Sequence, residues 1–73
     1  MIKEDFHGYR LGDAIHEAEL MISEIRDKRQ SQYVQFITGH GPIRDSLIAL
    51  FAQYGLKAEI SWSNSGMISV LIE

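Results

Sequence analysis

The chain contains no cysteine among its 73 residues. This absence excludes disulfide bonds, zinc fingers and any site in which a thiolate binds a metal or acts as a nucleophile. The chain also lacks an apolar run near the roughly 20 residues that a membrane-spanning helix needs. Residues 1–9 carry charges and have no apolar stretch typical of a secretory signal. We therefore expect a cytoplasmic protein that does not insert into membranes.

Positive charge is scarce, with seven Lys and Arg residues against ten Asp and Glu, for a net charge of −3. Tight, non-specific binding to a nucleic-acid duplex depends on neutralising many phosphates, so this composition argues against it. A nucleic-acid function would need a small local site or a larger partner such as a ribonucleoprotein. No linker, repeat or low-complexity segment divides the sequence, and we expect residues 1–73 to form a single domain.

Two segments have the periodicity of amphipathic helices. The first is predicted over Asp13–Arg29, with Gly12 or Asp13 as its N-cap. Its apolar residues recur at helical spacing: Leu11, Ala14, Ile15, Ala18, Met21, Ile22 and Ile25. The second helix is predicted to start at Pro42, which suits the first helical position, and to end before Gly55 at the C′ position. Its apolar stripe consists of Ile43, Leu47, Leu50, Phe51 and Tyr54.

Four segments have strand composition: Ile2–Phe6, Tyr33–Thr38, Lys57–Ser63 and Met67–Ile72. The second of them is apolar on both faces, which predicts a central strand. In the third, alternation places Trp62 on the buried side, so we expect Trp62 in the core. Turn residues separate the third and fourth segments, which predicts a hairpin between them: Asn64, Ser65 and Gly66.

The resulting element order is β-α-β-α-β-β. The simplest arrangement is an α/β two-layer sandwich, in which a four-stranded mixed sheet carries both helices on one face. In such a fold the first two strands are neighbours, and ligands bind where the carboxyl ends of the strands meet. We therefore expect His7 to lie beside the segment Gly39-His40-Gly41.

Asp5 and His7 are the candidate catalytic residues, because positions i and i+2 of a strand project from the same face. A carboxylate beside an imidazole fixes the ring tautomer and stabilises the protonated ring. Such a histidine can take a proton from a 2′-hydroxyl or from water, or give one to a leaving oxygen. In the alternative interpretation these are surface residues beside a turn, and Asp5 accepts hydrogen bonds from backbone amides.

The loop after the second strand is a candidate phosphate site, formed by Thr38, Gly39, His40 and Gly41. Glycines let the backbone approach a ligand, and the helix that follows offers unpaired N–H groups to an anion. Alternatively, the loop is only a tight turn between a strand and a helix, and its glycines serve the turn geometry alone.

Three further residues are candidates for nucleic-acid contacts. Arg10 and Arg44 could add charge-assisted hydrogen bonds to phosphate, and Tyr9 could stack on a base. A site for a divalent ion, formed by Asp5 together with His7 and His40, is a further alternative. No His, Asp or Glu cluster has convincing metal spacing, however, so we expect no cofactor.

Two motifs stand at the ends of the first two predicted strands, Asp5-Phe6-His7-Gly8 and Ile37-Thr38-Gly39-His40-Gly41. They resemble the Asp-Leu-His-Gly signature and the Gly-basic-Gly loop of the Smr (small MutS-related) domain family. Gly66, which enters the last strand, is a weaker likeness. His40 stands where the family usually has Lys or Arg. The resemblance implies a fold similar to the C-terminal domain of translation initiation factor 3.

The resemblance also implies an endonuclease that cleaves phosphodiester bonds, with RNA favoured over DNA as substrate and the ribosome as a candidate partner. For RNA, His7 would act as general acid or base on the 2′-hydroxyl path without a metal, oriented by Asp5. The amides of Gly39 and Gly41, with His40, would hold the phosphate.

Two other functions remain open from the sequence. The first is a non-catalytic module that binds nucleic acid or a ribosome, which the acidic net charge and His40 favour. The second is a homo-oligomeric interaction protein that buries an edge strand, because Met67–Ile72 is unusually apolar for an edge. The sequence does not settle the oligomeric state.

Overall fold

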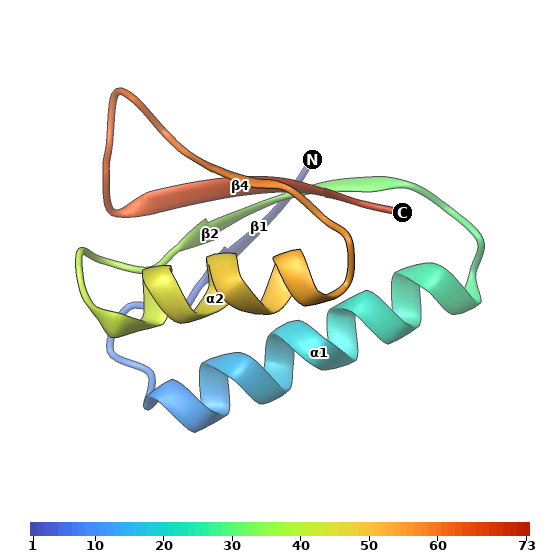
Figure 1. Cartoon of the computed structure of the whole chain (residues 1–73), viewed down its shortest axis with the longest axis horizontal. Helices are drawn as coiled ribbons and strands as arrows, with labels where there is room; N and C mark the ends of the chain where they lie inside the picture. The colour runs from blue at the N-terminus through green and yellow to red at the C-terminus, as the bar shows by residue number, and fades with distance from the viewer.

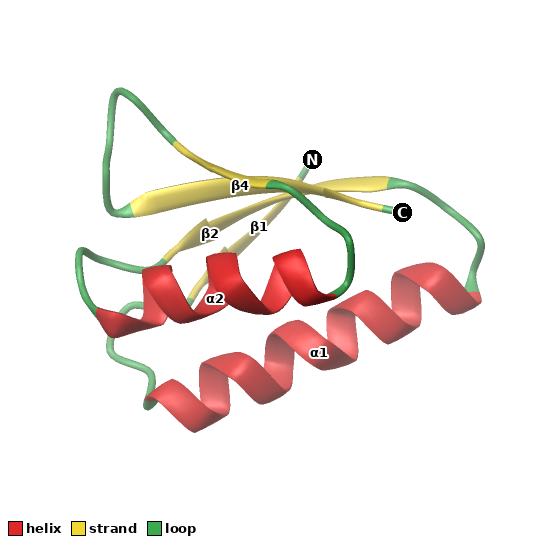
Figure 2. Cartoon of the chain, in the orientation of Figure 1, coloured by secondary structure: helices red, strands yellow, loops and turns green.

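The computed structural model of the chain describes residues Met1–Glu73. Its elements, in chain order, are β1 (Ile2–Asp5), α1 (Leu11–Asp27), β2 (Gln32–Ile37), α2 (Pro42–Gln53), β3 (Ala58–Ile60) and β4 (Met67–Ile72). Figure 1 shows both helices on the same side of the sheet, and Figure 2 shows the two layers by type of secondary structure. The predicted α/β two-layer sandwich and its element order are confirmed.

The four strands form one mixed sheet in the order β1-β2-β4-β3. β1 pairs in parallel with β2, with Asp5 opposite Ile37. β4 is antiparallel to both of its neighbours, β2 and β3. The carboxyl ends of β1 and β2 therefore meet at one end of the sheet, and the loop that enters β4 lies at that same end.

The core fills the space between the helices and the covered face of the sheet. It contains 15 buried apolar residues. Most of them belong to α1, β2, α2 and β4, and Phe6 and Leu56 come from the loops. Strand alternation directs Val34 and Phe36 of β2 into this core, together with Ile68, Val70 and Ile72 of β4. Neither helix combines the length and the apolar composition needed to cross a membrane.

Helix α1 begins two residues earlier than predicted, at Leu11 rather than Asp13. The predicted N-cap at Gly12 or Asp13 is wrong: Arg10 is the N-cap residue, in an extended conformation and without a side-chain capping bond. Instead, a backbone turn leads into the helix, in which Tyr9 N–H donates to Phe6 O. Ala14 N–H then donates to Arg10 O at the start of α1. A backbone turn of this kind leaves no capping residue for the sequence to reveal.

The two helices end in the same hydrogen-bond pattern, although different residues occupy the left-handed position. After α2, Gly55 has φ +76°, and Leu56 N–H donates to Phe51 O. After α1, Arg29 has φ +53°, and Gln30 N–H donates to Ile25 O. Both are Schellman motifs. Pro42 at the first position of α2 and Gly55 at C′ are as predicted.

Strand β3 is shorter than predicted and ends at Ile60, so Trp62 lies in the following loop. Its side chain is 98% exposed, and the prediction that it belongs to the core is wrong. The reason is the length of the partner strand: β4 begins at Met67, and its pairing with β3 ends at Ile60 opposite Ile68. Beyond that pair no strand lies opposite Trp62.

Strand β4 lies between β2 and β3, which corrects the prediction that Met67–Ile72 is an apolar edge. The apolar side chains on both of its faces are those of a central strand. The edges of the sheet are β1 and β3, and charged residues mark both of them: Lys3, Glu4 and Asp5 on β1 and Glu59 on β3. Charge on an edge strand discourages pairing with another chain.

Candidate functional site

Three loops meet at the end of the sheet drawn on the left of Figure 1: residues 6–10 after β1, residues 38–41 after β2, and residues 61–66 before β4. The carbonyl oxygen of Gly66 joins the last two. It accepts hydrogen bonds from Thr38 N–H at 2.9 Å, from Gly39 N–H at 3.0 Å and from the buried Thr38 hydroxyl at 3.2 Å. Thr38 therefore holds the two loops together rather than facing a ligand.

His7 lies beside Gly39, as predicted from the parallel pairing of β1 and β2. A Cβ atom built on Gly39 would stand 3.9 Å from His7 Cδ2. Gly39 has φ +72°, a conformation that favours glycine, and the turn brings its backbone against the imidazole. The catalytic candidate of the first loop and the glycine loop of the second therefore lie next to each other.

Asp5 contacts His7 through the backbone. Its Oδ1 accepts a hydrogen bond from His7 N–H at 2.9 Å, and the structure contains no hydrogen bond or ion pair between this carboxylate and the imidazole. The geometry is that of the alternative interpretation, in which Asp5 serves a backbone amide. Asp5 fixes the turn that carries His7, while the orientation of the ring depends on other contacts.

The N–H groups of the second loop divide into two sets. Gly39 N–H donates to Gly66 O, so it is not available to a phosphate, contrary to the role expected for it. The N–H groups of Gly41, Ile43 and Arg44 donate no hydrogen bond, and the N-cap Gly41 brings no capping side chain. Unpaired N–H groups at a helix N-terminus attract anions, so the start of α2 retains this capacity.

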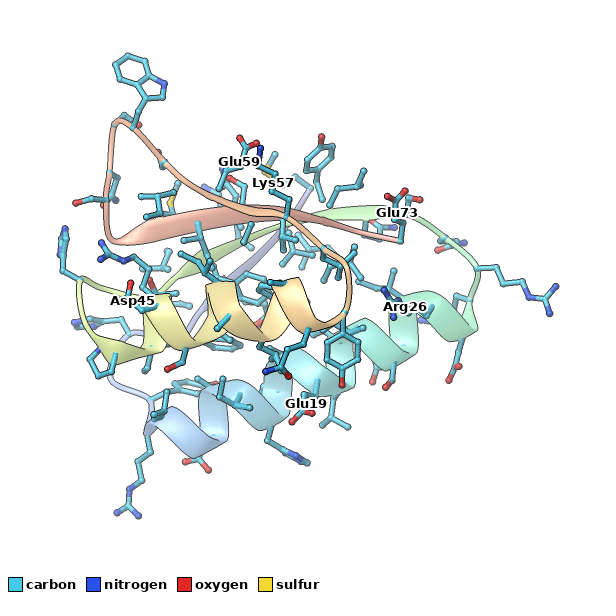
Figure 3. All side chains as sticks on the ribbon, in the orientation of Figure 1. Glu19, Arg26, Asp45, Lys57, Glu59 and Glu73 are labelled. Atoms are coloured by element: carbon cyan, nitrogen blue, oxygen red, sulfur yellow. The ribbon has the colours of Figure 1, made fainter.

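His40 and Arg44 both contact Ser65 of the third loop. His40 Nε2 lies 2.7 Å from Ser65 Oγ, and Arg44 Nη1 donates to Ser65 O at 3.0 Å. Arg44 Nε also donates to the carboxylate of Asp45 at 3.1 Å, at the start of α2 where Figure 3 labels Asp45. His40 and Arg44 therefore brace the loop before β4, and Arg44 keeps 21% of its side chain exposed.

Tyr9 and Arg10 lie apart from this cluster. The Tyr9 ring packs on Phe6, with 5.0 Å between ring centroids, and remains 44% exposed. Both residues line a shallow pocket of about 480 Å³ at the start of α1, with Gly8, Asp13, His16 and Glu17. The Arg10 side chain makes no hydrogen bond or ion pair, and no hydrogen bond joins either residue to the glycine loop.

No group of three or more His, Asp and Glu side chains is arranged to hold a metal ion. His40, one of the three residues considered for such a site, is held by Ser65 on the side of the loop before β4. His7, another of them, lies against Gly39.

Sequence reasoning missed the part played by residues 61–66. Ser65 and Gly66 complete the cluster, and Trp62 stands exposed in the same loop. The signal in the sequence was Gly66, which needs no positive φ but allows a close approach. A Cβ atom there would lie 3.3 Å from Gly39 Cα and 3.3 Å from His40 Cε1.

Comparison with protein-family models, curated proteins and solved structures gives no match for the chain.

Proposed function

We propose that the chain binds RNA at the junction of these three loops and cleaves it, with His7 as the general acid or base. The observation that carries the proposal is the position of the His7 imidazole beside Gly39, at the loop that leads into α2. A proton-transfer group and the unpaired N–H groups of a helix N-terminus are the parts that a phosphodiester requires. The likeness of both motifs to the Smr family agrees with this function.

The reaction uses the 2′-hydroxyl of the RNA as nucleophile. The 2′-oxygen loses its proton and bonds to phosphorus, the bond from phosphorus to the 5′-oxygen breaks, and that oxygen gains a proton. The products are a 2′,3′-cyclic phosphate and a 5′-hydroxyl end. His7 moves one of the two protons, and a positioned group of this kind accelerates a reaction by about 10²- to 10⁴-fold.

Asp5 acts in this scheme by positioning the residue that carries the imidazole. Its carboxylate oxygen holds His7 N–H, so it fixes the backbone from which the ring projects. Asparagine offers the same acceptor oxygen without the charge, whereas alanine offers neither. Asp5→Asn and Asp5→Ala therefore separate a backbone role from an electrostatic one.

The test is cleavage of a single-stranded RNA by the wild type and by His7→Ala, Asp5→Asn and Asp5→Ala, with analysis of the product ends. We expect His7→Ala to lose about 10²-fold or more of the rate. We expect Asp5→Asn to stay near the wild type and Asp5→Ala to fall. A strand with 2′-deoxyribose throughout should bind without being cut. Equal rates for the wild type and His7→Ala would refute the catalytic proposal.

A second candidate function is binding without cleavage, which one observation favours. The Asp5 carboxylate lies on a backbone amide and not on the ring, so no acid–imidazole pair is formed. The same experiment separates the two functions. Retention of labelled RNA with no product, together with weaker binding by Arg44→Ala, would identify a binding module.

A further inference from the structure

Trp62, the only tryptophan of the chain, has its side chain 98% exposed. Tryptophan is among the most extensively buried residues on average, because its large apolar ring is costly to leave in water. The chain has a core of 15 apolar residues within which other aromatic rings are packed, and Trp62 takes no part in it. The exposure of this one indole therefore requires a reason outside the core.

The loop that carries Trp62 is held by its own hydrogen bonds. Ser61 N–H donates to Met67 O at 2.9 Å, and Met67 N–H donates to Asn64 O at 3.1 Å. The hydroxyls of Ser61 and Ser63, which flank the tryptophan, lie 3.1 Å apart. These bonds give the loop a defined shape in which the indole projects outward, in the segment that extends away from the helices in Figure 1.

The base of the same loop belongs to the candidate site. Gly66 O binds the N–H groups of Thr38 and Gly39, and Ser65 contacts His40 and Arg44. Residues 61–66 contain no acidic side chain, whereas a guanidinium and an imidazole lie at the loop base. The guanidinium of Arg44 is paired with Asp45, so the preference for an anion comes from the unpaired N–H groups at the start of α2. A ligand suited to both Trp62 and these N–H groups combines a flat ring with negative charge.

We propose that Trp62 stacks on an unpaired nucleobase of the RNA whose phosphate lies at the glycine loop. Unpaired bases fit this chemistry because each has an exposed ring face and is linked to its neighbours through phosphates, whereas paired bases hide their faces within the stack. The inference rests on the proposed function and adds to it a preference for single strands. Stacking of this kind tolerates every base, so the loop selects strandedness rather than sequence.

The experiment uses two 12-nucleotide strands: a 2′-O-methyl oligoadenosine, which cannot react through its 2′-oxygen, and an abasic strand of equal length. Because Trp62 is the sole tryptophan, its emission reports on stacking directly. We expect the adenosine strand to quench the emission and the abasic strand to bind more weakly without quenching. A 12-base-pair duplex should quench less than the single strand.

Variants measured by anisotropy of the labelled strands separate the inference from the function on which it rests. Trp62→Ala should weaken binding of the adenosine strand about 10- to 100-fold, down to that of the abasic strand, and Trp62→Phe should recover most of the loss. Tyr33→Ala, at a 55% exposed ring on the uncovered face of the sheet, is the matched control and should change nothing.

If both strands bind and Trp62→Ala binds them as the wild type does, the stacking inference is wrong while the proposed phosphodiester site stands. If neither strand binds, both are wrong. A blue shift of the emission on vesicles of anionic phospholipid, with no response to either strand, would overturn the stacking inference and identify a lipid surface as the partner of the indole.

Discussion

Gly66 lies against the backbone of Gly39 so closely that a Cβ atom on Gly66 would stand 3.3 Å from the Gly39 Cα. This separation is shorter than ordinary van der Waals contact, and the neighbour is backbone, which yields less readily than the end of a side chain. The close approach is what allows Gly66 O to accept hydrogen bonds from both Thr38 and Gly39. The loop after β2 and the loop before β4 thus depend on one glycine.

Gly66→Ala should therefore lower the free energy of unfolding by about 1–2 kcal/mol, since the added methyl group separates the two loops. Gly12→Ala is the matched control: Gly12 lies in the first turn of α1, and a Cβ atom there meets nothing within 4 Å. That change should raise stability by about 0.5 kcal/mol. The free energy of unfolding of both variants is measured by urea denaturation, with far-UV circular dichroism as the signal. Equal changes for Gly66→Ala and Gly12→Ala would contradict the steric argument.

Arg29→Gly should stabilise the protein by about 0.5–1 kcal/mol. Arg29 has φ +53°, and a non-glycine residue in that region costs about 1–2 kcal/mol, whereas the equivalent position after α2 is already Gly55. The midpoint of thermal unfolding should rise by several degrees. Lys28→Gly, one residue earlier at φ −79°, serves as control and should destabilise. No gain for Arg29→Gly would count against the C-cap argument.

Gly41→Ser should raise stability and weaken phosphate binding at the same time. Gly41 is the N-cap of α2, and a serine hydroxyl there accepts a hydrogen bond from the N–H of Ile43 or Arg44. Capping should add about 0.3 kcal/mol, because glycine is already a tolerated N-cap, but it occupies a donor that the proposed site offers to phosphate. Unfolding and RNA anisotropy are measured on the same sample. Unchanged RNA affinity would show that these N–H groups do not serve the ligand.

Arg26→Ala should destabilise the fold by about 1–2 kcal/mol, because the guanidinium joins three elements. It donates from Nε to Glu73 O at 3.0 Å and from Nη2 to Tyr54 O at 2.9 Å, and Figure 3 labels Arg26 on α1 and Glu73 at the end of the chain. Arg26→Lys should recover less than half, since one ammonium lacks the planar fork that serves both oxygens.

The control for Arg26 is an exposed ion pair labelled in the same figure. Lys57 Nζ lies 3.9 Å from Glu59 Oε1, and its side chain is 87% exposed. Lys57→Ala should change the free energy of unfolding by less than about 0.5 kcal/mol. If Arg26→Ala and Lys57→Ala changed the free energy of unfolding equally, the hydrogen bonds of Arg26 to Glu73 and Tyr54 would not stabilise the fold.

The sequence predicted the elements that bury a continuous stripe or face. The strand-forming composition of Tyr33–Thr38 identified the strand now seen as β2, and Pro42 and Gly55 marked both ends of α2 within a residue or two. Periodicity could not show where β3 stops. The alternation of Ala58, Ile60 and Trp62 continues past Ile60, but β3 ends there because its antiparallel partner β4 begins opposite that point. Strand length is a property of the pair.

The edge position of β4 was wrong for a related reason. Met67 and Leu71 make Met67–Ile72 apolar on both faces, which is the same pattern that identified the central β2. The prediction nevertheless treated this strand as an unusually apolar edge. The crossover through α2 places β3 two positions away from β2, and β4 occupies the position between them. Position in the sequence does not fix position in the sheet.

Part of the candidate site followed from topology and part did not. Parallel strands β1 and β2 predicted that His7 lies beside Gly39, which the structure confirms. The partner of each polar group could not be predicted, because Gly39 N–H and the Asp5 carboxylate each have several acceptors or donors within reach of a turn. Only the structure shows that Gly39 N–H donates to Gly66 O and that the Asp5 carboxylate accepts from His7 N–H.

The insertion of β4 between β2 and β3 governs the order in which the molecule can assemble. β2 and β3 have no strand partnership with each other, so a nascent chain that has reached only Ile60 can pair β1 with β2 and nothing more. Synthesis of the final segment joins both halves of the sheet and closes the junction at Gly66 in a single event. A ribosome stalled before Met67 would therefore hold a chain with at most the β1–β2 pair, and removal of Met67–Ile72 should abolish the fold as a whole rather than trim its edge.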